Sequence, residues 1–303
     1  MEYSTLNKQR KPEVIEFLNQ TIRHPLFNSA IEQIEIVHST RGLQPAGMML
    51  VGETGLGKTT ILEYYKKHNN RLCNHKTELP VLLINIPAAA TAKQVLIDAV
   101  ETLGGQPGAR PTEAQLNRML RKLIEMRCTS LIIFDEFQHL ATATSSKTVI
   151  QIGNTIKNLM SDTKIPFILA GLPEAKWILN KHGELKRRFS QTIELKPLKI
   201  NKEEDLRYFA TYLKSIQQAT NVKSIEFSDN ELTTRFWLAT GGMLAAISRI
   251  VEFAMGAADL KSGITKEDLA TGYKLFNPMS TGDDQNPFLM DRKGLSKALG
   301  FIK

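Results

Sequence analysis

Cysteine is scarce in this 303-residue sequence, which contains only Cys73 and Cys128. Two cysteines cannot build the disulfide framework of small secreted proteins, so a reducing, cytoplasmic environment is expected. Long apolar runs are absent as well, and no stretch approaches the ~18 residues of a membrane span. The basic N-terminal segment is followed by no apolar core, which argues against a secretion signal. We therefore expect a cytoplasmic protein with no membrane partner.

Acidic residues are the minority among the charged side chains. Lys and Arg number 39 and Asp and Glu 31, which gives a net charge of +8 and a pI near 9.3. This balance suits a polyanionic partner such as nucleic acid, although basic proteins without such a partner are common. The 42% hydrophobic content is sufficient for a packed core. The length allows one large domain or two ordinary ones.

A glycine-rich motif follows an apolar stretch at residues 48–51. Residues 52–59 read GETGLGKT, which matches the phosphate-binding P-loop pattern G-x-x-x-x-G-K-[ST]. The apolar stretch predicts a strand and residues 60–65 predict a helix, so the motif has the strand–loop–helix context that it requires. The glycines let backbone N–H groups point at phosphate oxygens, and the start of the helix adds its positive dipole end. The motif therefore predicts a nucleoside-triphosphate site.

Two side chains of this motif have specific roles in binding ATP with Mg²⁺. Lys58 can reach the β- and γ-phosphates, and the Thr59 hydroxyl can ligate Mg²⁺. The residues expected to contact ATP are Gly52, Glu53, Thr54, Gly55, Leu56, Gly57, Lys58, Thr59 and Thr60.

An acidic pair follows a second apolar run, at residues 131–134. Asp135 and Glu136 come directly after this run, as at the end of a buried parallel strand. In P-loop enzymes the first acid holds the Mg²⁺ that bridges the phosphates. A second carboxylate beside it can polarise the attacking water. Asp135 is therefore assigned to the metal and Glu136 to the water, which predicts an Mg²⁺-dependent ATPase.

Strand and helix patterns alternate on both sides of these motifs. Such alternation, with nucleotide motifs at strand ends, predicts an α/β fold with a doubly wound parallel sheet. Thr112 begins one helix with Gln115 at the capping-box position. Beyond the P-loop and acidic strands, the expected strands are 80–86, 165–170 and 192–195, and the expected helices are 93–103, one that begins after Thr112, and 148–160.

The spacing of apolar residues divides the chain into four parts. Residues 1–45 are expected to form an N-terminal helical segment, and residues 46–200 the α/β nucleotide domain. Apolar spacing is helical throughout the next stretch, so residues 201–276 are assigned to a small helical domain. Residues 277–303 begin with a Pro-, Ser-, Gly- and Asp-rich stretch and are expected to be a flexible tail, because they lie at the end of the chain. The alternative is a docking peptide, since residues 286–303 carry apolar side chains among basic ones. Trp177 and Trp237 are expected in the core.

Three stretches carry a resemblance to a known family. They are DEFQHL at 135–140, GNTIKNL at 153–159 and IPFILAGLPEA at 165–175. With the P-loop and a helical lid, they resemble the TniB/TnsC family of AAA+ ATPases, which regulate DNA transposition and include CRISPR-associated relatives. The resemblance runs from roughly Pro25 to Tyr273. It implies ATP-dependent oligomerisation on double-stranded DNA as a ring or helical filament, with recruitment of a transposase and a target-selection protein.

The resemblance also implies an arginine finger that reaches the γ-phosphate of a neighbouring subunit. Arg187 and Arg188 lie just before the strand 192–195, where AAA+ proteins place this finger, and the choice between them stays open.

Two features of the sequence depart from the general AAA+ pattern. Residues 169–171 contain no Asn or Thr to sense the γ-phosphate, and Leu244 stands where many relatives have a sensor arginine. Both departures suggest a slow switch and not a motor.

DNA contacts are expected on and near the helix that begins after Thr112. Cations in this region can make sequence-neutral contacts to phosphates. The alternative is a helix face that simply points to solvent, since Arg118 and Lys122 stand at positions i and i+4 of the expected helix. The candidate residues are Arg110, Arg118, Arg121, Lys122 and Lys147.

Two other functions share the same motifs. A replication-initiator or helicase-loader ATPase would have the P-loop, the acidic pair and the lid, but it favours a sensor arginine and, for an initiator, a C-terminal helix-turn-helix; neither is evident in the sequence. An ATP-gated signalling module would use the nucleotide for partner choice without binding DNA. Measuring DNA binding in the presence of ATP separates it from the transposition regulator.

Overall fold

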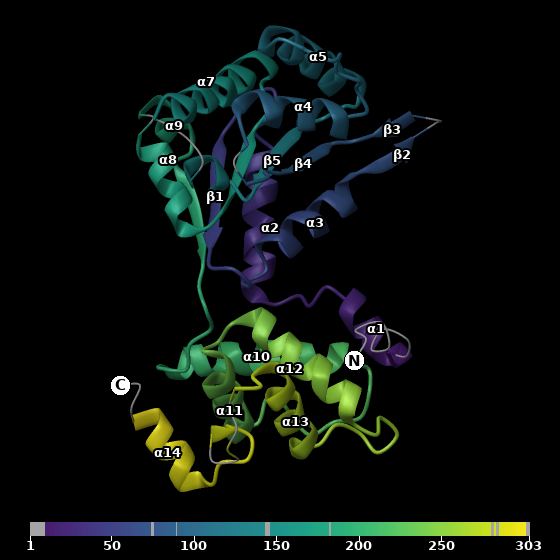
Figure 1. Ribbon diagram of the computed structural model, residues 1–303, viewed down its shortest axis with the longest axis vertical. Helices are drawn as coiled ribbons and strands as arrows, with labels where there is room; N and C mark the ends of the chain where they lie inside the picture. Colours follow the sequence, from purple (N-terminus) through teal and green to yellow (C-terminus); the bar gives the residue numbers. More distant parts are fainter. Residues whose placement is uncertain are drawn as a thin grey trace. The chain divides into compact units, whose positions relative to one another are not determined.

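The computed structural model describes residues 10–73, 76–88, 90–142, 146–181, 183–279, 282 and 285–300. The chain divides into two units (Figure 1). Leu26–Lys196 form the sheet unit, and Met1–Pro25 together with Pro197–Lys303 form the helical unit.

A parallel five-stranded sheet organises the sheet unit. Its strands are β4 (Val81–Asn85), β5 (Leu131–Asp135), β6 (Phe167–Gly171), β1 (Gly47–Gly52) and β7 (Gln191–Leu195), in that spatial order. Every residue of β1, β5 and β6 is buried, which explains why these strands read as unbroken apolar runs. The expected parallel α/β fold is confirmed. Because β6 lies between β1 and β5, the carboxyl ends of these three strands meet at one edge of the sheet.

Helices cover this sheet and connect its strands (Figure 1). The longer ones are α2 (Pro25–His38), α3 (Lys58–Asn69), α4 (Ala92–Thr102), α5 (Glu113–Met126) and α7 (Ser146–Thr163). The expected capping box begins α5: Thr112 accepts a hydrogen bond from the Gln115 backbone N–H and its own N–H donates to the Gln115 side chain. The shorter elements are the β2 (Arg71–Cys73)–β3 (Lys76–Glu78) hairpin, α6 (His139–Thr142), η1 (Pro173–Ala175), α8 (Lys176–Asn180) and α9 (Gly183–Arg188).

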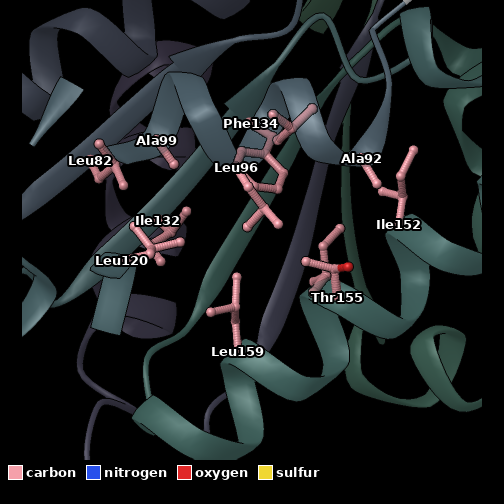
Figure 2. A pocket seen from close by; sticks show the side chains of 12 residues that line it. Leu82, Ala92, Leu96, Ala99, Leu120, Ile132, Phe134, Ile152, Thr155 and Leu159 are labelled. Atoms are coloured by element: carbon pink, nitrogen blue, oxygen red, sulfur yellow. The ribbon is translucent and has the colours of Figure 1, made fainter. Parts of the chain in front are cut away.

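An extensive apolar core lies between the sheet and helices α4, α5 and α7. Alternate residues of the strands point into it, as the period of two requires. Figure 2 shows the side chains at its centre, where Leu96 of α4, Leu120 of α5 and Leu159 of α7 approach Ile132 and Phe134 of β5. They enclose a cavity of about 20 Å³, which is close to the minimum for one water and is lined almost entirely by carbon. This cavity is therefore a packing void and not a ligand site.

The helical unit consists of α1 (Pro12–Asn19), α10 (Glu203–Ala219), α11 (Asn230–Thr240), α12 (Leu244–Ala257), α13 (Lys266–Phe276) and α14 (Arg292–Gly300). The turn between α11 and α12 requires glycine at position 242, where φ is +79° and a Cβ would lie 1.9 Å from the Leu198 carbonyl oxygen. In the described part of the chain no single helix is long and apolar enough to span a membrane. Helices α11 and α12 reach the required length and hydropathy only when taken together, and a bend of 109° separates them.

The N-terminal helices differ from the expected single segment at residues 1–45. Helix α1 belongs to the helical unit, whereas α2 belongs to the sheet unit. Val14 and Phe17 of α1 are buried, and the Lys11 ammonium donates hydrogen bonds to the carbonyl oxygens of Met255 and Ala258 at the end of α12. The apolar face of α1 and the free carbonyls at a helix end explain this attachment.

The described part of the C-terminal segment is packed, which corrects the expectation of a flexible tail over 277–303. Phe288 is fully buried and makes ring contacts with Phe236 and Tyr273. The Asn286 side chain donates to the Ala270 carbonyl oxygen at 2.9 Å. One buried aromatic ring and a satisfied amide are sufficient to hold a short segment that otherwise reads as a linker. The expectation for Trp177 is also wrong, since its side chain is 44% exposed.

Candidate nucleotide-binding site

The P-loop connects the end of β1 to the start of α3. Gly55 and Gly57 have φ values of +83° and +87°, in the left-handed region that glycine adopts without strain. Gly57 caps α3, and the first backbone N–H groups of that helix have no partners within it. A glycine loop that ends in a helix N-terminus is an anion-binding arrangement, as the motif predicts.

Lys58 is the first residue of α3, a position where the helix dipole disfavours a positive charge. Its side chain is only 6% exposed, and the ammonium donates to the carbonyl oxygens of Gly52 at 2.6 Å and Glu53 at 2.9 Å. Burial lowers the pKa of Lys58 below its ordinary value, while the nearby charges of Glu136, Asp135 and Glu53 act in the opposite direction. An ammonium kept at this unfavourable place fits a role in binding phosphate.

Thr59 and Asp135 come together from distant parts of the sequence. The Thr59 hydroxyl donates to Asp135 Oδ2 at 2.7 Å, and Asp135 Oδ1 accepts from the Glu136 N–H at 2.9 Å. Asp135 is 2% exposed and forms no ion pair with any described residue, so its charge has only neutral donors. A hydroxyl and a carboxylate are the hard oxygen ligands that Mg²⁺ prefers, and Mg²⁺ commonly takes few protein ligands beside substrate phosphates. The two side chains therefore fit an Mg²⁺ ion shared with bound ATP.

Glu136 lies next to this pair in a sparsely populated backbone conformation, with φ of +57°. Its carboxylate accepts a hydrogen bond from the side-chain amide of Gln138. The Gln138 oxygen in turn accepts from the Leu172 N–H at 3.0 Å. Sequence reasoning missed Gln138 as a site residue, although the residue stands two positions after the acidic pair.

The two arginine-finger candidates at the end of α9 differ in their surroundings. The Arg188 guanidinium donates to the Ser161 hydroxyl of α7 at 2.8 Å and is partly buried. Arg187 is exposed.

The positions where many AAA+ proteins have residues that sense the γ-phosphate are apolar or otherwise engaged in the structure. The end of β6 is apolar and buried, and Arg249 of the helical unit pairs with Glu252 at 2.7 Å.

The predicted DNA-contacting residues do not form one cluster. Arg110, Arg118 and Lys122 line a groove of about 420 Å³ beside the 104–111 loop, together with Pro107, Pro111 and Met119 among others. Arg121 instead forms an ion pair with Asp162 of α7 at 2.7 Å. Lys147 belongs to α7, and its side chain lies outside the described residues. We refer below to Arg110, Arg118 and Lys122 as the groove cations.

Comparisons with known proteins agree with the fold described above. The family model TniB, described as bacterial TniB protein, matches residues 16–199. Among solved structures, Cdc6p from Pyrobaculum aerophilum is similar with a TM-score of 0.62 and 15% identity, over 86% of this chain and 70% of that one. The ORC2 protein of Aeropyrum pernix in its ADP form has a TM-score of 0.60 and 13% identity, over 92% and 74%.

The Aeropyrum pernix ORC1 protein, solved in complex with DNA, has a TM-score of 0.58 and 14% identity, over 86% of this chain and 68% of that one. A comparison with curated proteins finds no match. At these identities the solved structures establish the AAA+ fold and nothing finer.

Proposed function

The chain belongs to the TniB family, and from that premise we propose that it is an ATP-dependent regulator of DNA transposition. In this proposal it binds ATP with Mg²⁺, assembles on double-stranded DNA, and links a target-selection protein to the transposase. The observation that carries the nucleotide part is the contact between Thr59 and Asp135 at 2.7 Å, beside the buried Lys58. Two motifs 76 positions apart in sequence meet at the edge where a P-loop site must form.

ATP hydrolysis is assigned to the residues at this edge. Lys58 and the P-loop N–H groups bind the phosphates, while Thr59 and Asp135 hold Mg²⁺, which neutralises charge on the phosphate oxygens. Glu136 orients the attacking water and accepts its proton. The apolar end of β6 and Leu244 in the lid provide none of the usual phosphate sensors. Slow turnover, suited to a switch, follows from this composition.

Assembly through ATP requires a cation that one subunit extends to the next. Arg187 is the better candidate for this finger, because its side chain is exposed on α9 whereas Arg188 is hydrogen-bonded to Ser161 within its own chain. A planar guanidinium suits the charge spread over the γ-phosphate oxygens.

The groove cations are proposed to contact DNA phosphates. None of the three forms an ion pair within the described part of the chain, in contrast to Arg121. Their charge is therefore free for a polyanion, and phosphate contacts carry no sequence information. That the similar ORC1 structure was solved in complex with DNA is consistent with this assignment. The same likeness to Cdc6p and ORC proteins keeps a replication-initiator role as the second candidate, although the family match favours transposition.

Electron microscopy and a competition assay together test the proposal. The protein is mixed with duplex DNA and a non-hydrolysable ATP analogue, and the Lys58→Ala variant serves as the nucleotide-binding control. Regular oligomers on DNA of any sequence, seen only with the analogue and only for the wild type, support the transposition regulator. Strong preference for one specific duplex in competition supports the initiator. No DNA binding at low salt in either nucleotide state refutes both and favours a signalling module.

A further inference from the structure

The loop after the acidic strand is attached to the neighbouring strand β6 at two points. The Phe137 N–H donates to the Ala170 carbonyl oxygen at 2.8 Å. The Gln138 side-chain oxygen accepts from the Leu172 N–H at 3.0 Å, just beyond the end of β6. Gln138 is 6% exposed, so both ends of its amide depend on protein partners.

The hydrogen-bond network determines which way the Gln138 amide points. A backbone N–H can only donate, so the side-chain oxygen must face Leu172. The NH₂ group then faces Glu136 and donates to its Oε2 atom. One oxygen of the Glu136 carboxylate is thereby held, and the other has no hydrogen-bond partner among the described residues.

Gly171 makes this approach possible. A Cβ at position 171 would lie 2.3 Å from the Gln138 side-chain oxygen and 3.2 Å from the Phe137 N–H. Only glycine leaves room there for the amide. Gln138 therefore joins the ends of the acidic strand β5 and its neighbour β6, and the P-loop strand β1 lies on the other side of β6. It brings a polar amide to a strand end that has no polar side chain of its own.

We infer that Gln138 is the positioning residue for Glu136. Its NH₂ group holds one carboxylate oxygen of Glu136 so that the free oxygen faces the attacking water, while its own oxygen ties this arrangement to the end of β6. The inference rests on the proposed ATPase function. A Glu side chain has several staggered rotamers open to it unless a partner holds one of them, and a misdirected base loses most of its effect on the reaction rate.

The Gln138→Glu variant separates positioning from structure. It keeps the size of the side chain and its oxygen, so the bond from the Leu172 N–H remains, but it removes the donor to Glu136. The matched control is Gln217→Glu in the helical unit, where the Gln217 side-chain oxygen also accepts from a backbone N–H, that of Phe227, at 2.9 Å. Gln138→Met provides a second test without an added charge; it removes both the donor to Glu136 and the acceptor for the Leu172 N–H.

Steady-state ATP hydrolysis and ATP affinity are measured for each variant. For Gln138→Glu and Gln138→Met we expect kcat to fall about ten- to hundred-fold, the range that a misplaced catalytic group produces, with the Kd for ATP unchanged within about two-fold. Gln217→Glu keeps wild-type kcat. Wild-type kcat in both Gln138 variants, or a faster rate in either, overturns the inference, and a faster rate identifies the bond as a restraint.

A double variant tests whether Gln138 acts through Glu136. Added to Glu136→Gln, the Gln138→Glu change should alter the remaining rate by less than about two-fold, since the group that it positions is already lost. If the rate losses of the two single variants multiply in the double variant, Gln138 acts independently of Glu136, and the inference is overturned. Failure of the proposed function looks different: the wild type itself then hydrolyses no ATP, with or without DNA.

Discussion

Removal of the groove cations should change the salt dependence of DNA binding. We consider the variant in which Arg110, Arg118 and Lys122 are all replaced by Ala. If each cation neutralises one phosphate, three contacts per subunit are lost. At roughly −0.9 per phosphate, the slope of log K against log salt becomes less steep by about 2.7. Between about 50 and 200 mM salt, wild-type affinity should therefore fall about 40-fold more than that of the variant.

Arg121→Ala is the matched control for this experiment. Arg121 lies on the same helix, but its guanidinium pairs with Asp162 at 2.7 Å, and both side chains are about half exposed. An exposed pair of this kind contributes roughly 0–1 kcal/mol to stability, so the control variant should remain folded. Its salt slope should equal that of the wild type.

Fluorescence anisotropy with a labelled duplex and a non-hydrolysable ATP analogue, at a series of salt concentrations, gives both slopes. Mixed-sequence duplexes should be affected equally, because phosphate contacts carry no sequence information. An unchanged slope in the triple variant, or an equal change in Arg121→Ala, refutes the assignment of DNA to the groove. The DNA site then lies on another surface.

Four further outcomes are expected. Lys58→Ala should abolish ATP binding and ATP-dependent assembly, because no other described cation is hydrogen-bonded to the P-loop. Nucleotide titration and light scattering measure the two effects, and ATP-dependent assembly in this variant contradicts the proposed site. Glu136→Gln should keep ATP binding and lower the hydrolysis rate about 10²–10⁴-fold, which gives longer-lived oligomers. Wild-type turnover in this variant excludes Glu136 as the base. Arg187→Ala should lower assembly-dependent hydrolysis at least about 10³-fold, whereas Arg188→Ala should not, and the reverse result moves the finger to Arg188. Phe288→Ala should lower the free energy of unfolding of the helical unit by about 3–5 kcal/mol in chemical denaturation, and a loss under about 1 kcal/mol means that the segment is not packed in solution.

The sequence by itself determined the fold class and the central chemistry. The P-loop, the acidic pair and the alternating patterns are local signals, since each depends on residues that are close along the chain. Local signals were enough to assign Thr59 and Asp135 to the same Mg²⁺, and the two side chains are indeed in contact, because carboxyl ends of parallel strands share one edge. The resemblance to the TniB family, confirmed by the family match, depended on equally short stretches. The roles of the individual site residues stay predictions.

Only the tertiary structure decided which side chains contact each other across long sequence separations. Arg121 and Lys122 are neighbours in sequence, yet one pairs with Asp162 while the other lines the groove, because the helix turns about 100° per residue. Phe288 lies in a linker-like composition and is buried by helices more than ten residues away. Gln138 reaches Leu172, 34 positions later, because β5 and β6 are adjacent in the sheet. Strand order and packing set these contacts, and neither can be read from local spacing.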